Sequence, residues 1–268
     1  MSLIPIVSSR KRFYKAGEIS KDDRVKLVNL VDPRRSANKA ILMDKFTEEI
    51  KGKHVVILVH GYNNTFEKIC DAYLRVSSQL ITNKVPHDTV VGYIWPGGTK
   101  KLNYWPAKRR AGQLSKRLGK LLTSISSSAS QVDIIAHSLG CFITLNAMKT
   151  ITAPVRNIYL MAAAVGNYTL TKGMPYANAA SKADTTFIFK SKDDDILKYS
   201  FPFGEGGDNA LGSTGPVPAD KVVDNALIID CSNHPDPIKH RSYSRRTEIF
   251  SFIGTNQTPD NTPGEVKL

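Results

Sequence analysis

One stretch of the chain decides the fold: Asp133-Ile134-Ile135-Ala136-His137-Ser138-Leu139-Gly140. It is an apolar strand pattern that runs directly into small-x-Ser-x-Gly. A tight strand-to-helix turn of this kind presents a serine hydroxyl above the end of a sheet, and its crowding requires small residues two positions before and after the serine. Ala136 and Gly140 meet that requirement. Ser138 is therefore a candidate nucleophile, and a strand–helix junction with a serine N-cap is the alternative interpretation.

A second motif lies upstream of the serine. The buried-strand pattern His54-Val55-Val56-Ile57-Leu58-Val59 ends in His60-Gly61-Tyr62. Gly61 would let the backbone approach a substrate closely, because it has no Cβ. A loop at this position supplies one of the two amides that stabilise an oxyanion in acyl transfer. We expect the backbone N–H groups of Tyr62 and Leu139 to provide that pair.

Strand and helix patterns alternate along the chain. Strands are expected over residues 25–31, 55–59, 89–94, 132–136, 157–162, 185–190 and 222–230. Helices are expected over residues 37–51 (with Ser36 as cap), 65–83, 107–124, 139–151 and 243–254. This alternation predicts an α/β fold with a mainly parallel central sheet and helices on both faces. The site should lie at the carboxyl ends of the strands, where both motifs fall.

The length of 268 residues suits one large domain, which we expect over residues 1–254. Residues 165–184 and 201–219 are expected to be irregular, and the second segment is rich in Gly and Pro. Together they could form a small lid. Residues 255–268 are polar and contain two prolines, which predicts a flexible, frayed tail.

The net charge of +13 is the unusual feature of the composition. The densest basic cluster, mostly on an expected amphipathic helix, comprises Lys100, Lys101, Lys108, Arg109, Arg110, Lys116, Arg117 and Lys120. A solvated basic face is the simpler interpretation, and a weak attraction to anionic surfaces is the functional one. The sequence carries no nucleic-acid-binding signature and leaves the oligomeric state open.

The cysteines and the N-terminus bear on the compartment. Cys70, Cys141 and Cys231 are odd in number and widely spaced, which argues against a disulfide framework and favours buried thiols in a reducing compartment. No apolar run is long enough to span a membrane. The basic cluster Arg10-Lys11-Arg12 follows the apolar N-terminal residues, whereas a secretory signal has the reverse order. We therefore expect a cytoplasmic protein.

A serine nucleophile needs a general base. When the chain order is serine, acid, histidine, the base must be His234 or His240, because only these follow Ser138. Both lie between the last expected strand and the last helix, and His240 is favoured because His234 is nearer the strand. The other four histidines are assigned elsewhere: His54 and His87 to the surface, His60 and His137 to the two motifs.

The base in turn needs an orienting acid, which should follow the strand expected over residues 185–190. Three adjacent aspartates, Asp193-Asp194-Asp195, stand there. One could be buried against the histidine while the others stay solvated. A helix N-cap cluster also accounts for them, since acidic residues favour that end of a helix. Periodicity cannot choose among the three.

These positions together resemble an α/β hydrolase. More closely, the chain resembles a bacterial family of α/β-hydrolase-like proteins, the domain of unknown function numbered nine hundred. The matching stretches run in the same order over about residues 25–254: Val59-His60-Gly61-Tyr62-Asn63-Asn64-Thr65-Phe66, Trp95-Pro96, Ala136-His137-Ser138-Leu139-Gly140, Ser191-Lys192-Asp193-Asp194-Asp195-Ile196-Leu197, Leu211-Gly212-Ser213-Thr214-Gly215 and His240-Arg241-Ser242-Tyr243.

The resemblance implies that Asp194 is the acid, that His240 is the base, and that the protein hydrolyses small-molecule acyl esters in the manner of an esterase or lipase. The chemistry needs neither cofactor nor metal. A thioesterase or phospholipase activity would use the same residues, and a non-catalytic binding protein on the same fold is the alternative of another class.

The substrate pocket is expected to be lined by residues near the two motifs and by aromatic side chains, although aromatics beside a sheet are more often core: His60, Gly61, Trp95, Tyr104 and Tyr168. The chain departs from the family pattern at two places. Cys141 stands where the family often has a polar residue, and Gly97-Gly98 follow Trp95-Pro96 where a serine is common. Both departures could alter the acyl pocket.

Overall fold

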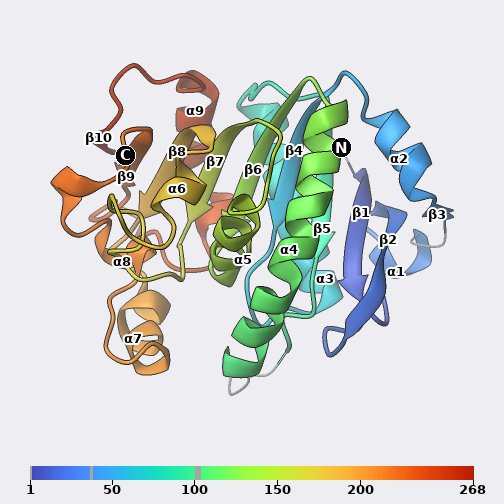
Figure 1. The fold of residues 1–268 in the computed structure, drawn as a ribbon, viewed down its shortest axis with the longest axis horizontal. Coiled ribbons are helices and arrows are strands. Elements are labelled where there is room, and N and C mark those ends of the chain that lie inside the picture. Colours follow the sequence, from blue (N-terminus) through green and yellow to red (C-terminus); the bar gives the residue numbers. More distant parts are fainter. Residues whose placement is uncertain (1, 37–38, 100–103) are drawn as a thin grey trace.

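The computed structural model describes residues 2–36, 39–99 and 104–268. These residues build a ten-stranded sheet in the order β10-β9-β8-β7-β6-β4-β5-β1-β2-β3 (Figure 1). Its strands are β1 (Leu3–Arg10), β2 (Ile19–Asn29), β3 (Lys39–Ile41), β4 (His54–Val59), β5 (Thr89–Ile94), β6 (Gln131–His137), β7 (Val155–Met161), β8 (Ala183–Lys190), β9 (Ala226–Asp230) and β10 (Gly264–Lys267). All neighbours from β10 to β1 are parallel, and β1–β2 and β2–β3 are antiparallel. The expected parallel sheet is confirmed.

Helices pack on both faces of the sheet, as the alternation predicts. One hydrophobic cluster joins α2, α4, α5 and α6 to the sheet, and a second joins α3 and α9 to the opposite face (Figure 1). The helices are α1 (Pro33–Ser36), α2 (Met43–Glu49), α3 (Phe66–Thr82), α4 (Tyr104–Ser128), α5 (Leu139–Met148), α6 (Ala177–Ala180), α7 (Phe201–Gly204), α8 (Leu211–Thr214) and α9 (Thr247–Thr255).

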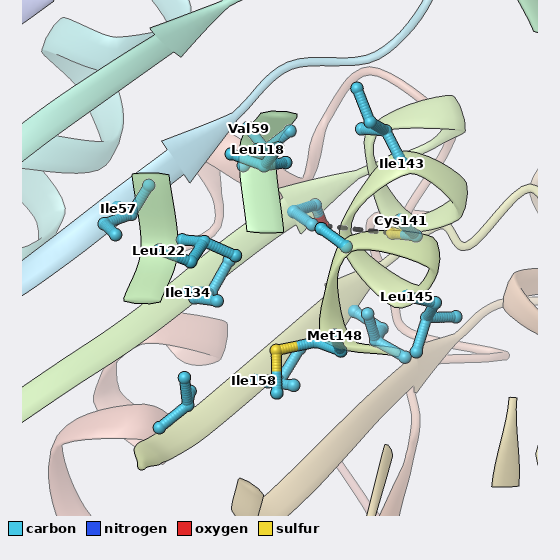
Figure 2. Packing of buried hydrophobic residues seen from close by; sticks show 14 of the residues in the cluster. Ile57, Val59, Leu118, Leu122, Ile134, Cys141, Ile143, Leu145, Met148 and Ile158 are labelled. Atoms are coloured by element: carbon cyan, nitrogen blue, oxygen red, sulfur yellow. Dashed lines mark hydrogen bonds between the residues drawn. The ribbon is translucent and has the colours of Figure 1, made fainter. Parts of the chain in front are cut away.

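The central strand β4 explains why its sequence is a continuous apolar run. All six of its residues are buried. Ile57 and Val59 belong to the cluster beneath α4 and α5, whereas Val56 and Leu58 belong to the cluster beneath α3. Figure 2 shows Ile57 and Val59 among the side chains of α4 and α5. Burying each such side chain stabilises the fold by about 1.5–3 kcal/mol, so both faces of the strand must be apolar.

The helix α3 follows the expected pattern closely. The Thr65 hydroxyl caps it by accepting a hydrogen bond from the Lys68 amide, at 3.4 Å. Its buried face includes Ile69, Tyr73, Val76 and Leu80, the residues whose spacing predicts it. An apolar stripe at intervals of three and four residues faces one side of a helix.

The helix α4 is longer than the expected 107–124 and carries the basic cluster. Ala111, Leu114 and Leu118 face the sheet, and Lys116 and Lys120 are exposed. The described part of the cluster thus includes the solvated face that the pattern predicts, and Lys100 and Lys101 lie outside the described residues. Among the described helices, none combines the length and apolar character needed to cross a membrane.

The amino-terminal region differs most from expectation. The strand β1 has no counterpart among the expected elements. The helix expected over residues 37–51 begins at residues outside the described part, and from Lys39 onward the chain forms β3 and then α2. The expectation of one helix is wrong because β3 gains backbone hydrogen bonds from β2, with Ile41 opposite Val25. Side-chain periodicity gives no sign of such pairing.

The carboxyl-terminal tail is not frayed throughout, so that expectation is also wrong. Gly264–Lys267 form β10, in which Val266 lies opposite Ile229 of β9. The Leu268 amide donates to the Asp230 carbonyl at 3.0 Å, and Glu265 accepts from Lys190 at 3.0 Å. The tail orders because β9 would otherwise leave a row of unpaired backbone groups at the sheet edge.

The two segments expected to be irregular contain short helices and bond to each other. Residues 165–184 include α6, and residues 201–219 include α7 and α8. Gly166 pairs with Ala210 in an isolated antiparallel bridge, and the Asn167 amide donates to the Asn209 carbonyl at 2.9 Å. The two loops therefore form one connected structure at the carboxyl ends of the parallel strands.

The amino ends of the parallel strands hold a histidine that was expected at the surface. His54 begins β4 and is buried, with its Nε2 hydrogen-bonded to the Asp133 carboxylate at 2.9 Å. Arg156 of β7 donates through Nε to the same carboxylate at 2.9 Å. The surface assignment of His54 is wrong because the register of β4 against β6 brings it over Asp133. All three cysteines are buried, as expected.

Candidate active site

The turn at Ser138 has the shape that its sequence predicts. It stands between the end of β6 at His137 and the start of α5 at Leu139, with φ 55° and ψ −125°. Such a backbone conformation costs a non-glycine residue about 1–3 kcal/mol. Three backbone hydrogen bonds hold it: the Ser138 amide donates to the Met161 carbonyl at 3.0 Å, and the Ser138 carbonyl accepts from the Cys141 amide at 2.9 Å and from the Ala164 amide at 3.3 Å.

Glycine is required at two positions around this turn. A Cβ on Gly140 would lie 2.5 Å from the Val59 carbonyl oxygen, so only glycine lets α5 begin against the end of β4. A Cβ on Gly61 would lie 2.8 Å from the Ser138 Cβ. The two sequence motifs are therefore in direct contact.

Three side chains from different parts of the chain form a continuous hydrogen-bonded series. The Ser138 Oγ lies 2.9 Å from Nε2 of His240, and Nδ1 of His240 lies 2.8 Å from Oδ2 of Asp194. The carboxylate fixes the tautomer, because Nδ1–H donates to it and Nε2 is left to accept the serine proton. Ser138 and His240 are 7% and 8% exposed, and Asp194 is fully buried.

Burial separates the three adjacent aspartates. Asp194 accepts through its second oxygen from the Leu197 amide at 3.0 Å. Asp193 is partly exposed and accepts from the Asn233 amide at 3.2 Å, whereas Asp195 is exposed. Asp194 is the member that contacts His240. Within the described ranges, no group of three or more His, Cys, Asp and Glu side chains is arranged to hold a metal ion.

The rival histidine lies elsewhere. His234 Nδ1 accepts a hydrogen bond from the Asp236 amide at 3.2 Å, and its Nε2 lies 3.6 Å from a Glu248 carboxylate oxygen. Its ring is therefore engaged within its own loop and with α9. Of the two candidates for the base, His240 is the one beside Ser138.

His137 has a supporting position that the sequence did not reveal. Its Nε2–H donates to the backbone carbonyl of His240 at 2.6 Å, and the two rings lie 4.9 Å apart. Burial, reinforced by the nearby His240, lowers the pKa of His137 from 6.5 to about 4. A neutral His137 thus holds the backbone of His240, whose side chain lies beside Ser138. Its position directly before the serine is the one signal that could have suggested this.

A network of buried groups fixes the loop after β4. His60 donates from Nδ1 to the Gly61 carbonyl at 2.6 Å and accepts at Nε2 from the Trp95 amide at 3.1 Å. The Trp95 indole donates to the His60 carbonyl at 2.8 Å, and Arg10 Nε donates to the Trp95 carbonyl at 2.9 Å. Burial, followed by the charge of Arg10, lowers the pKa of His60 well below its usual value, so His60 is neutral.

The residues expected to line the pocket have different roles. Trp95 is fully buried and stacks on the buried His60, so both support the loop from beneath, and their part in a substrate pocket stays a prediction. Gly61 lies against Ser138. Tyr104 is partly buried and meets the Tyr62 ring edge-on, with centroids 5.8 Å apart.

Tyr168 lies apart from these groups. Its hydroxyl donates to Asp208 at 3.3 Å, and the side chain is 37% exposed on the loop after β7. Within the described residues none of its recorded contacts reaches Ser138 or Tyr62. The expectation that Tyr168 forms a wall of the pocket gains no support from its contacts.

The two departures from the family pattern have structural accounts. Cys141 is fully buried, its thiol donates to the Ala136 carbonyl at 3.3 Å, and burial raises its pKa. Figure 2 shows Cys141 inside the apolar cluster. Gly97 packs so tightly that a Cβ would lie 3.1 Å from the Trp95 ring and 3.4 Å from the Gly61 carbonyl oxygen. Both residues sit beneath the site.

The family described as alpha/beta hydrolase of unknown function (DUF900) matches residues 34–255. The chain belongs to this α/β-hydrolase family. No curated protein matches it. The family and the sheet topology agree with the fold class that the sequence predicts.

Solved structures with a similar fold include hydrolases named as esterases. An IroE-like serine hydrolase from Shewanella oneidensis is 15% identical, with a TM-score of 0.51 and coverage of 94% of this chain and 78% of that one. A feruloyl esterase module from Clostridium thermocellum is 12% identical, with a TM-score of 0.45 and coverage of 94% and 87%. An esterase from Pyrobaculum calidifontis is 11% identical, with a TM-score of 0.43 and coverage of 77% and 76%. At this identity the likeness to the first of these structures, whose TM-score is above 0.5, is one of fold.

Proposed function

We propose that this protein is a serine hydrolase that cleaves carboxylic esters through an acyl-enzyme intermediate. One observation carries the proposal: the unbroken series Ser138 Oγ, His240 Nε2, His240 Nδ1 and Asp194 Oδ2, with contacts of 2.9 and 2.8 Å. A serine activated by a base, with the base oriented by a buried acid, is the arrangement that acyl transfer requires. Membership of an α/β-hydrolase family supports the same reaction class.

Each residue has a defined part in the proposed reaction. The Ser138 oxygen attacks the acyl carbon while Nε2 of His240 takes the hydroxyl proton. The tetrahedral intermediate collapses, the bond to the leaving alcohol breaks, and His240 returns the proton to that alcohol. Water then attacks the acyl-serine with the same histidine as base, and the acid product leaves. Asp194 keeps the histidine in one tautomer and stabilises its charged form.

Two backbone amides are proposed to stabilise the oxyanion. Leu139 is the first residue of α5, and the first amides of a helix have no acceptor within it. Tyr62 follows Gly61, whose backbone lies against the Ser138 side chain. Removing one fixed donor from such a site costs about 3–4 kcal/mol of transition-state stabilisation. The buried network of Arg10, Trp95 and His60 would keep the Tyr62 amide in place.

The first test is hydrolysis of p-nitrophenyl esters from acetate to long acyl chains, together with a thioester series. Ser138→Ala should lower turnover by about 10⁴-fold or more. Ser77→Ala is the matched control, because Ser77 is also a buried serine and its hydroxyl has no recorded partner within the described residues. It should leave turnover unchanged.

Two outcomes would overturn the proposal. Full turnover in Ser138→Ala would remove the serine from the mechanism. A folded wild type that neither hydrolyses any ester or thioester nor reacts with a fluorophosphonate probe would favour a binding role on the same fold.

A further inference from the structure

Three large aromatic side chains near the carboxyl ends of the parallel strands are more than half exposed. Phe203 is 95% exposed, Tyr199 is 65% exposed and Trp105 is 59% exposed. Trp105 lies in the first turn of α4, Tyr199 in the π-helical turn Ile196–Ser200, and Phe203 in α7. Figure 1 shows α7 and the first turns of α4 beyond the edge at which the parallel strands end. Single exposed apolar residues are ordinary, but several around one site mark an interaction surface.

Two of these aromatics lie on segments that contact each other: Phe203 on α7 and Trp105 on α4. The platform, as we call it, consists of α7, Glu205 and the first turns of α4. Glu205, directly after α7, accepts from the Tyr104 hydroxyl at 2.7 Å and forms an ion pair with Lys108 of α4. A Cβ on Gly204 would lie 3.2 Å from the Tyr104 ring, so α7 and α4 are in contact. The contact between α7 and α4 therefore keeps Phe203 and Trp105 close together. Both side chains stay exposed.

The platform adjoins the proposed active site on two sides. Tyr104 meets Tyr62 edge-on, and Tyr62 follows the glycine that touches Ser138. The π-helical turn begins two residues after Asp194. A surface that covered the exposed aromatics would thus lie close to Tyr62 and to the segment that carries Asp194.

Cations without acidic partners accompany the aromatics. Arg109 and Lys198 are exposed, and no ion pair is recorded for either within the described residues. Lys198 lies over the Tyr199 ring at 5.2 Å. The nearby acidic groups are Glu205, which Lys108 neutralises, Asp208, which accepts from the Tyr168 hydroxyl at 3.3 Å, and the exposed Asp195. With a net charge of +13, the molecule favours an anionic partner.

We propose that Trp105, Tyr199 and Phe203, with Arg109 and Lys198, form an aromatic-basic rim that docks on an anionic lipid surface. Amphipathic rings and a bare phenyl group suit the boundary between headgroups and acyl chains, and each basic residue near such a surface adds attraction. The inference rests on the proposed ester hydrolysis, for which it names the substrate class: esters carried by a lipid assembly.

The test measures co-flotation with phosphatidylcholine vesicles, with and without phosphatidylglycerol. It uses Ser138→Ala protein so that binding is separated from turnover. Binding is expected only with phosphatidylglycerol and should weaken at high salt. Tyr199→Ser/Phe203→Ser should lower the partition coefficient by about tenfold or more. Arg109→Gln/Lys198→Gln should lower it by about tenfold.

Two matched controls separate the rim from general effects. Lys116→Gln/Lys120→Gln removes the same charge from exposed positions two turns further along α4. Val31→Ser removes an exposed apolar side chain that follows β2, next to the amino end of β1. Both should keep most of the binding.

Several results would overturn the inference. These are no binding to phosphatidylglycerol vesicles, equal loss in rim and control variants, or equal binding to both vesicle types. If the wild type hydrolyses short dispersed esters but binds no vesicles, lipid docking by the rim is refuted and the proposed ester hydrolysis stands. If vesicle binding depends on the rim but no ester is hydrolysed, lipid docking stands and the proposed ester hydrolysis is refuted. Self-association through the rim, seen as a dimer in sedimentation without vesicle binding, would also count against a lipid partner.

Discussion

The amino and the carboxyl ends of the parallel strands each hold a buried histidine–aspartate pair with nearly the same hydrogen-bond length. At the amino end, His54 Nε2 lies 2.9 Å from Asp133 Oδ2. At the carboxyl end, His240 Nδ1 lies 2.8 Å from Asp194 Oδ2. Both aspartates are buried. A short hydrogen bond between histidine and a buried carboxylate is therefore not enough to distinguish a general base from a structural pair.

The surroundings make the difference. Asp133 also accepts from Arg156 at 2.9 Å and from the Asn157 amide at 3.1 Å, so a permanent cation neutralises it. Asp194 accepts from a neutral amide, and within the described residues no arginine or lysine forms an ion pair with it. Only His240 has its second nitrogen on a serine hydroxyl. The carboxylate of the second pair is left to stabilise a charged imidazole.

The largest predicted effect is a loss of ester turnover when the histidine at the carboxyl ends of the strands is replaced. His240→Asn should lower ester turnover by about 10³–10⁴-fold or more, because it removes the proton acceptor. His54→Asn should keep turnover within about threefold and lower the free energy of unfolding by about 1–3 kcal/mol, because it disturbs a buried hydrogen bond. Ester kinetics and urea unfolding of both variants measure the two effects. Loss of turnover in His54→Asn at unchanged stability would erase the distinction.

The next effect concerns the cation at the amino end. Arg156→Met should lower the free energy of unfolding by about 3–5 kcal/mol, because it leaves the Asp133 charge buried without its partner. The control Arg75→Met breaks a surface pair with Asp71 and should cost at most about 1 kcal/mol. Urea unfolding compares them. A small cost for Arg156→Met would mean that Asp133 is stabilised by its backbone and histidine contacts alone.

The smallest effect is a dependence on pH that comes from the carboxyl end. Between 6.5 and about 4, the unfolded chain binds a proton at His137 that the folded protein does not, since its folded pKa is about 4. Stability therefore falls as the pH decreases through this window, by at most about 1.4 kcal/mol for each pH unit. His60 acts in the same direction.

Urea unfolding at several pH values measures this loss. His137→Gln can still donate to the His240 carbonyl and does not titrate, so it should show a smaller loss between pH 6.5 and 4. An unchanged pH profile in that variant would exclude His137 as a source of the effect.

Local sequence patterns predicted much of the candidate active site. The apolar strands before Gly61 and Ser138 predict both motifs, because a parallel strand covered on both faces must be apolar throughout. The order of the chain and the family resemblance indicated Asp194 and His240. The supporting roles of Arg10, Trp95 and His137 were not predictable, because their partners are backbone atoms far away in the sequence, which side-chain patterns do not record.

The sequence by itself determined which residues are buried in the central strands, where glycine is required, and which chemical groups follow each strand. Those features depend on neighbours within a few residues. Periodicity left the three aspartates open and the family resemblance indicated Asp194, whereas only the tertiary structure decided that His54 is buried and that β3 and β10 complete the sheet. Strand register and edge pairing set these contacts, and they depend on backbone groups that every residue shares.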